Sequence, residues 1–174
     1  RSSSSRTCTS PSARAIPCGK TSRASTRRSG SEINSVSVGK NVRQFNPGDE
    51  VFGYLPSATG RGTFAEYVCA EENLITLKPS NLTFEEAAAA PLAAVTALQG
   101  LRDAGQIRAG QKVLIQGAAG GVGTFAVQIA KSFGAEVTAV CSARNMDMAR
   151  SLGAGHVIDY EKEDFTQSGK RYDL

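Results

Sequence analysis

The sequence predicts an α/β protein in which a small antiparallel β unit precedes a parallel sheet flanked by helices. Two patterns carry this prediction. A short apolar strand at 113–115, a glycine-rich turn and an amphipathic helix at 122–133 follow one another, and a second strand at 136–141 comes directly after them. This strand–helix–strand order is typical of parallel pairing. Upstream, short β-branched runs flank a turn at 46–49, which is typical of antiparallel strands.

Composition divides the chain into three segments. Residues 1–30 contain six Arg and one Lys without any acidic residue, so the remaining 13 basic and 16 acidic residues give the rest a net charge of −3. We expect a disordered tail rich in Ser and Arg over 1–35, a small β unit over 36–79 and an α/β unit over 80–174. No stretch reaches the ~18 consecutive apolar residues of a membrane helix, so no membrane partner is expected.

Three explanations of the basic tail stay open. It could be a mitochondrial transit peptide, rich in Arg and Ser, although no leucine precedes Leu55 to build an amphipathic helix. It could be a basic arm for nucleic acid, but the globular part is mildly acidic, so a nucleic-acid partner is not expected. It could also be an artefact, such as a misread or out-of-frame 5′ end.

Local signals place the strands and the helix around residue 80. Two short strands are expected within 62–77, where apolar residues alternate. Thr83 and Glu86 fit a capping box, with Thr83 as the N-cap of an Ala-rich helix. Pro91 predicts an interruption of that helix and the start of a second one, which runs to about Leu101.

The turn between the first strand and the next helix carries a nucleotide-binding pattern. Ala118, Gly120 and Gly123 fit A-x-G-x-x-G, and the strand–turn–helix context makes this pattern informative. Gly120 would let the backbone approach a pyrophosphate, and Gly123 would let the helix pack close to the strand. N–H groups near Gly121 and Val122 would face the phosphates at the positive end of the helix dipole. The alternative is a glycine-rich turn that binds nothing.

Apolar spacing also defines one face of this helix and its end. The residues on the expected face are Val122, Phe125, Ala126, Ile129, Ala130 and Phe133. Gly134 is placed to end the helix.

The residues after the second strand predict which dinucleotide is preferred. An NAD site would carry Asp or Glu at the end of this strand to bond the ribose hydroxyls. Here Ser142 and Arg144 follow Cys141, and no acid appears before Asp147. A hydroxyl and a guanidinium suit a 2′-phosphate, so we predict NADPH. The alternative is that Arg144 is an ordinary exposed arginine.

A third strand is expected at 156–159. Tyr160 ends it at the edge where such sheets bind ligands, and could pack beside the adenosine phosphate or lie on an ordinary surface. His156 has no Cys or carboxylate partner at metal-ligand spacing, so no metal site is expected. The four cysteines form no CxxC pair and are expected to be reduced, which favours a cytoplasmic location. A mitochondrial location applies if the tail is a transit peptide.

Together these stretches resemble the medium-chain dehydrogenase/reductase superfamily, in its quinone oxidoreductase-like branch. The resemblance covers residues 36–174 and rests on VGKNVRQFNPGDEVFGY, GTFAEYV, TFEEAAAAPLAAVTALQGL, QGAAGGVGTFAVQIAKSFGAEVTAVCSAR and LGAGHVIDY. It implies that 36–79 form part of a GroES-like β-barrel domain. It implies that 80–174 form the N-terminal half of a Rossmann domain, with NADPH in the cleft between the two domains.

The resemblance also implies roles for individual residues. Thr96 would contact the nicotinamide side of NADPH, Gly120 to Gly123 would hold the pyrophosphate, and Ser142, Arg144 and Tyr160 would surround the 2′-phosphate. The implied reaction is hydride transfer from NADPH to a quinone, an enone or another carbonyl compound, with orientation of the bound partners supplying most of the catalysis. No catalytic residue is assigned. The alternative is a non-enzymatic relative that keeps the nucleotide site.

Two departures from the family set further expectations. The Ser/Arg tail stands in place of the first half of the barrel, and the chain stops where a fourth strand would begin, at 171–174. We therefore expect a fragment that is inactive as it stands, from a full-length protein compatible with a homodimer. The twelve residues between Val51 and Phe64 contain no cysteine, so the structural zinc lobe of alcohol dehydrogenases is expected to be absent. The region that would supply a catalytic zinc site does not match the family.

Overall fold

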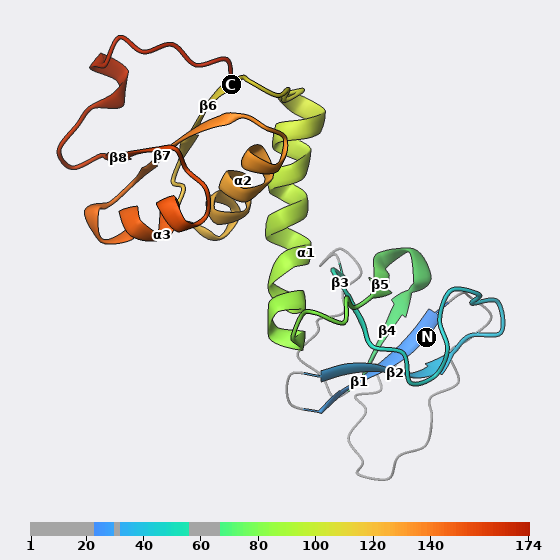
Figure 1. Ribbon diagram of the computed structural model, residues 1–174. Coiled ribbons are helices and arrows are strands. Elements are labelled where there is room, and N and C mark those ends of the chain that lie inside the picture. The colour runs from blue at the N-terminus through green and yellow to red at the C-terminus, as the bar shows by residue number, and fades with distance from the viewer. Residues whose placement is uncertain (1–22, 30–31, 56–66) are drawn as a thin grey trace, which may run out of the picture. The chain divides into compact units, whose positions relative to one another are not determined.

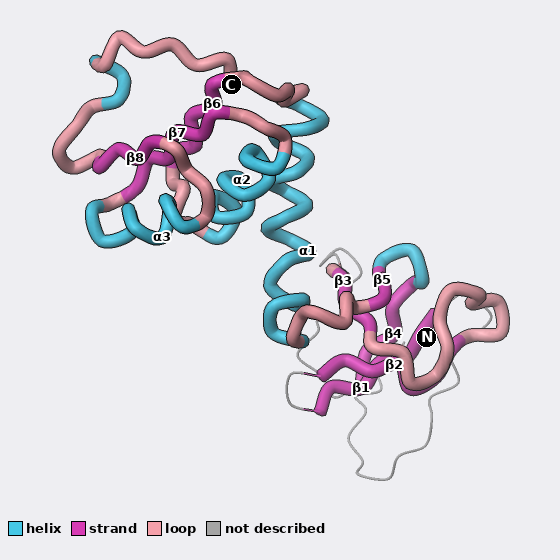
Figure 2. The backbone as a smooth tube through the Cα atoms, in the orientation of Figure 1, coloured by secondary structure: helices cyan, strands magenta, loops and turns pink. Residues whose placement is uncertain are grey.

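The chain folds as two compact units, Arg1–Ala87 and Ala88–Leu174. The structure is a computed structural model that describes residues 23–29, 32–55 and 67–174 (Figure 1). The first unit contains short antiparallel strands, and the second alternates strands with helices (Figure 2). Within the described ranges, no helix has the length and apolar character needed to cross a membrane.

Among its described residues, the first unit contains two small antiparallel sheets. The strands β1 (Arg23–Ser29), β2 (Glu32–Val38) and β4 (Tyr67–Glu71) pair in the order β2-β1-β4. The shorter strands β3 (Val51–Gly53) and β5 (Ile75–Leu77) pair with each other. Their antiparallel pairing confirms the expectation from the turn signals. The core of this unit includes Phe45, Val51 and Ala70.

Within residues 1–35, where a disordered tail is predicted, the part that the structure describes contains strands. Residues 23–29 form β1, and the segment from Glu32 onward forms β2. β1 is the central strand of its sheet and pairs with β2 on one side and β4 on the other. Backbone pairing on both edges stabilises a strand without an apolar pattern of its own, which local composition does not reveal. Residues 1–22 lie outside the described part of the chain.

The long helix α1 (Phe84–Leu98) begins at the predicted capping box and passes through Pro91. The N–H of Thr83 donates to Glu86 Oε2 at 2.9 Å, and the N–H of Glu86 donates to Thr83 Oγ1 at 3.2 Å. The predicted interruption at Pro91 is wrong. A proline inside a helix lacks its N–H donor and crowds the carbonyl four residues earlier, but the remaining backbone bonds carry α1 through this position. A π-helical turn, Gln99–Ala104, ends it.

Three parallel strands form the sheet of the second unit. They are β6 (Lys112–Gln116), β7 (Glu136–Cys141) and β8 (His156–Asp159), in the order β6-β7-β8. The middle strand is buried from Val137 to Cys141. At the other edge of β6, Leu174 accepts a bond from the N–H of Leu114 at 2.9 Å, and the C-terminus lies beside this strand (Figure 1). The structure assigns no strand to residues 171–174, where a fourth strand is expected, but Asp173 and Leu174 bond to the backbone of β6.

The helices α2 (Gly121–Ser132) and α3 (Met146–Ser151) connect these strands. α2 packs on β6 and β7, whereas α3 packs on β7 and β8. The predicted face of α2 is partly wrong, because Val127 is fully buried and Val122 is 43% exposed. Gly134 ends the helix as predicted, with φ of +79°. The following N–H, from Ala135, donates to the carbonyl of Ala130 at 3.1 Å, which completes a Schellman motif.

Candidate nucleotide-binding site

A tight turn joins β6 to α2. Gly117 has φ of +67°, in the left-handed region that favours glycine. Its carbonyl accepts a bond from the N–H of Gly120 at 2.9 Å, and this closes the turn. The N–H of Ala118 donates to the carbonyl of Val140 in β7 at 3.1 Å. The position of the turn is therefore set by β7 as well as by β6.

Gly123 occupies the place where α2 comes closest to this turn. A Cβ at this position would overlap the carbonyl oxygen of Gly117 and lie 2.8 Å from the Cα of Ala118. Both are backbone atoms, which cannot move aside as the end of a side chain can. Glycine is required here by packing, as the A-x-G-x-x-G pattern predicts.

The N-terminus of α2 is open to a ligand. Gly120 is the N-cap and has no side chain to bond the first helical N–H groups. Gly120, Gly121 and Val122 are exposed, and a Cβ on Gly121 would meet no atom within 4 Å. The first N–H groups of the helix, those of Gly121, Val122 and Gly123, therefore lack a side-chain cap at the positive end of the helix dipole. This donor set and the bare backbone fit a pyrophosphate.

Loops from the next two strands emerge at the same edge of the sheet. The parallel register pairs Cys141 with Asp159, so Ser142 and Tyr160 leave the sheet at the same level. The N–H of Tyr160 donates to the carbonyl of Cys141 at 3.3 Å and joins the two loops directly. Arg144 is exposed on a 3₁₀ turn, Ala143–Asn145.

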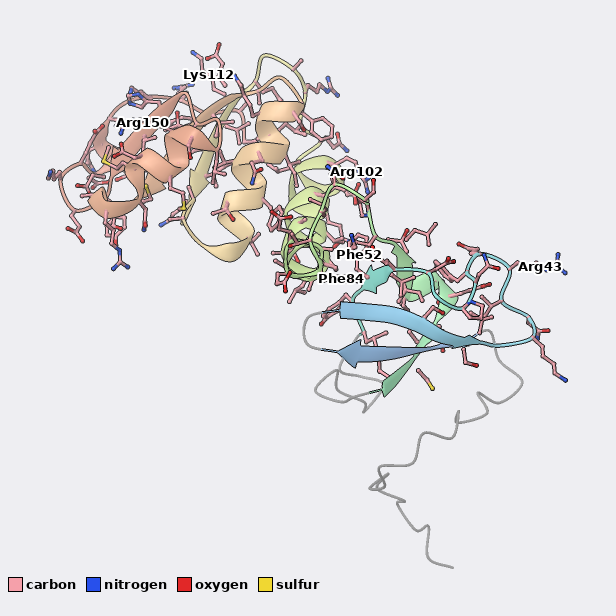
Figure 3. All side chains as sticks on the ribbon, turned by 60° about the horizontal axis from the view of Figure 1, so that its bottom comes forward. Arg43, Phe52, Phe84, Arg102, Lys112 and Arg150 are labelled. Carbon is pink, nitrogen blue, oxygen red and sulfur yellow. The ribbon has the colours of Figure 1, made fainter. Side chains whose placement is uncertain are left out.

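Further hydrogen bonds fix the loop after β7. The hydroxyl of Ser142 accepts a bond from Asn145 Nδ2 at 3.1 Å, and its carbonyl accepts one from the N–H of Asn145 at 2.9 Å. On α3 beyond this loop, Arg150 (labelled in Figure 3) pairs with Asp147 at 2.9 Å. The nearest acid after Arg144 therefore already has a cationic partner. Arg144 itself stays exposed at the edge of the sheet.

Two ionisable groups lie beneath these loops. Asp159 is 6% exposed, and its Oδ1 accepts a bond from the N–H of Glu161 at 3.2 Å. Burial raises the pKa of the neighbouring Cys141 thiol, and the charge of Asp159 raises it further. Cys141 is therefore an uncharged part of the core beneath the site.

The structure brings seven of the eight predicted site residues to one edge of the sheet. These seven are Gly120, Gly121, Val122, Gly123, Ser142, Arg144 and Tyr160. Thr96 is exposed on α1, and its hydroxyl donates to the carbonyl of Leu92 in the same helix at 2.7 Å. The predicted contact of Thr96 with the nicotinamide stays a prediction. Sequence reasoning missed Asp159, because only the strand register shows that it lies beneath Ser142 and Tyr160.

In the part of the chain that the structure describes, no three or more His, Cys, Asp or Glu residues lie together as metal ligands would. His156 instead contacts Lys170, with 3.2 Å between Nε2 and Nζ. Because a lysine ammonium can only donate, the Nε2 atom of His156 accepts in this contact.

Comparison with known proteins places this site in a family. Residues 121–172 match the family described as zinc-binding dehydrogenase. The chain is 44% identical over 146 residues to a 2-methylene-furan-3-one reductase of Solanum lycopersicum, covering 80% of this chain and 37% of that protein. It is 40% identical over 154 residues to a mitochondrial NAD(P)H oxidoreductase of Bos taurus, covering 83% of this chain and 39% of that protein.

A solved structure agrees with these matches. The quinone oxidoreductase of Coxiella burnetii superposes with a TM-score of 0.73 and 37% identity, over 80% of this chain and 44% of that chain. The chain thus spans less than half the length of each of these relatives. The match extends through the strand–turn–helix corner and the loops at the edge of the sheet. The chain belongs to the medium-chain dehydrogenase/reductase superfamily, in its quinone oxidoreductase-like branch.

Proposed function

We propose that this chain carries the phosphate-binding part of an NADPH-dependent reductase that acts on a quinone, an enone or another carbonyl compound. The observation that carries the proposal is the corner between β6 and α2. There Gly123 lets the helix approach the turn, and the N–H groups of the exposed residues Gly121 and Val122 have no side-chain cap. Such an N-terminus is suited to a diphosphate because its dipole and its free donors act together.

The residues around the corner support NADPH as the dinucleotide. Arg144 offers a fork of donors to a 2′-phosphate, and Ser142 adds a hydroxyl on the same loop. Tyr160 reaches the same edge from the next loop and is exposed, so its ring is available to the adenosine. None of these three side chains is an acid that would bond the ribose hydroxyls of NAD in their place.

The proposed reaction follows from the chemistry of this cofactor and from the relatives. Bound NADPH supplies a hydride, and the substrate takes up that hydride together with a proton. The protein's own contribution is to hold the dinucleotide in one position, which turns an encounter between two molecules into an oriented reaction. The tomato relative is named as a reductase of a furanone and the Coxiella relative as a quinone oxidoreductase, which supports a conjugated carbonyl or quinone substrate.

Calorimetric titration of the chain with NADPH and with NADH tests the nucleotide part of this proposal. We expect measurable binding of both and at least about tenfold tighter binding of NADPH, since one charged contact is worth about 1.4 kcal/mol. Equal binding would overturn the NADPH preference, and no binding at millimolar concentration would overturn the nucleotide site itself.

The whole protein's activity needs a separate test. A protein that carries this chain within the full length of its relatives should oxidise NADPH only when an enone or a quinone is present. If it binds NADPH without turnover of either substrate, it is a nucleotide-binding protein without this reaction.

Location and assembly stay predictions. The cytoplasmic location rests on the lack of a CxxC pair in the sequence, and the mitochondrial name of the bovine relative supports the alternative. A homodimer of the full-length protein stays a prediction as well.

A further inference from the structure

We propose that Lys162 is a second cation for the 2′-phosphate, on the loop after β8, and that it helps to set the preference for a phosphorylated dinucleotide. This inference rests on the nucleotide site proposed above. It adds a residue from the loop after β8, whereas Arg144 lies after β7.

The register of the sheet brings the loops that carry Lys162 and Arg144 to the same edge. Cys141 and Asp159 are paired partners at the ends of β7 and β8. Arg144 lies three residues beyond the first, and Lys162 lies three residues beyond the second. Because parallel strands end at one edge, the two cationic side chains start from loops on the same edge of the sheet.

The loop that carries Lys162 is held firmly at its base. The carbonyl of Asp159 accepts bonds from the N–H groups of Lys162 at 3.0 Å and Glu163 at 2.9 Å. Asp159 Oδ1 accepts a further bond from the N–H of Glu161. The backbone bond from Tyr160 to Cys141 ties the start of the loop to β7. The positions of these loop residues are therefore set by the end of the strand.

The side chain of Lys162, by contrast, extends into solvent and makes a long ion pair with Asp159. It is 79% exposed, and its Nζ lies 3.8 Å from Asp159 Oδ2, beyond hydrogen-bond distance. That Oδ2 atom is buried and has no hydrogen-bond partner among the described residues. Because Nζ is already 3.8 Å from this oxygen and 79% of the lysine side chain is exposed, Lys162 can lean toward a phosphate at this edge while its charge stays close to Asp159.

The charged residues around Lys162 on this loop are acidic. Glu161 and Glu163 flank Lys162 and are exposed, and Asp159 lies beneath. Without Lys162 the loop would present only acidic groups beside the phosphate that Arg144 binds. Removing the lysine should therefore weaken binding of the phosphorylated nucleotide much more than binding of its unphosphorylated counterpart.

Calorimetric titration with adenosine 2′,5′-bisphosphate and with 5′-AMP tests this inference on the whole chain. We expect Lys162→Glu to weaken binding of the bisphosphate about tenfold and to change AMP binding less than about threefold. Lys162→Arg, which keeps the charge, should bind the bisphosphate nearly as the unchanged chain does. Lys170→Glu is the matched control, since Lys170 is exposed and contacts His156 at the opposite end of β8.

The outcomes separate the two proposals. Suppose that the unchanged chain prefers the bisphosphate and that Lys162→Glu and Lys170→Glu bind it with equal affinity. The role of Lys162 is then overturned, and the nucleotide site stands. If Lys162→Glu weakens both nucleotides equally, the lysine does not read the 2′-phosphate and the inference again fails. If the unchanged chain binds neither nucleotide, the proposed nucleotide site fails and this inference fails with it.

Discussion

Gly123 lies so close to Gly117 that a Cβ on Gly123 would overlap the carbonyl oxygen of Gly117. That oxygen also accepts the bond from the N–H of Gly120 that closes the turn. The beginning of α2 and the end of β6 are therefore packed backbone against backbone. This contact fixes the direction in which the free N–H groups of the helix point.

Gly123→Ala should destabilise the second unit by about 1–3 kcal/mol, because the added methyl group forces backbone atoms apart. Urea unfolding followed by circular dichroism measures the change. Gly121→Ala is the control, since its Cβ would meet no atom within 4 Å. It should lower the stability by less than about 0.5 kcal/mol. Equal losses for the two variants would mean that the close approach at Gly123 does not constrain the turn.

Arg144→Glu should reverse the preference between NADPH and NADH. The substitution removes the guanidinium that would bind the 2′-phosphate and places a carboxylate where it can bond ribose hydroxyls. Titration with both dinucleotides should show at least about a tenfold loss for NADPH and no loss for NADH. Arg108→Glu, at an exposed position before β6, makes the same change of charge away from the site. An unchanged preference in Arg144→Glu would show that Arg144 does not take part.

Lys78→Met should loosen the segment that leads from β5 into α1. The side chain of Lys78 is 5% exposed and pairs with Glu50 at 3.1 Å. It also donates to the carbonyl of Leu82 at 2.6 Å and lies 5.0 Å from the centre of the Phe84 ring, labelled in Figure 3. Methionine keeps the aliphatic part and loses the donors, so we expect a local loss of about 1–3 kcal/mol.

Hydrogen exchange read from peptides over residues 75–87 measures this loss as faster exchange. Lys40→Met is the control, because Lys40 is exposed in the turn after β2. Identical exchange in the two variants would mean that the polar contacts of Lys78 contribute nothing to this segment.

Cys141 should react with alkylating reagents more slowly than Cys69. Burial, followed by the charge of Asp159, raises the pKa of the Cys141 thiol, so less of the reactive thiolate forms in the folded state. The folded state holds this proton more tightly than the unfolded state. The associated stability is therefore present below the ordinary thiol pKa and is lost as the pH rises through the raised value. Peptide mapping after brief alkylation, at pH values around the ordinary thiol pKa, shows which of the two cysteines is modified first. Modification of Cys141 before Cys69 would contradict the prediction.

The parts of the fold that sequence predicted well depend on local chemistry. The capping box of Thr83 and Glu86, the end of α2 at Gly134 and the turn before α2 each require particular residues at particular places. A single stretch of sequence therefore contains the whole signal. The close packing of Gly123 belongs to the same group, because only glycine fits there.

The parts that sequence missed depend on partners far along the chain. β1 is a strand because β2 and β4 pair with it, and its own residues show no apolar pattern. The helix passes through Pro91 because its remaining bonds suffice. The relation of Lys162 to Arg144 appears only from the register that pairs Cys141 with Asp159.

The most direct test of the nucleotide site is to follow the backbone amides of the chain by nuclear magnetic resonance during titration with NADPH. The account predicts that the largest shifts fall on the amides of Gly121, Val122 and Gly123, with further shifts at Ser142 and Arg144. Binding that leaves the three amides at the start of α2 unchanged, or no binding at millimolar NADPH, would contradict it.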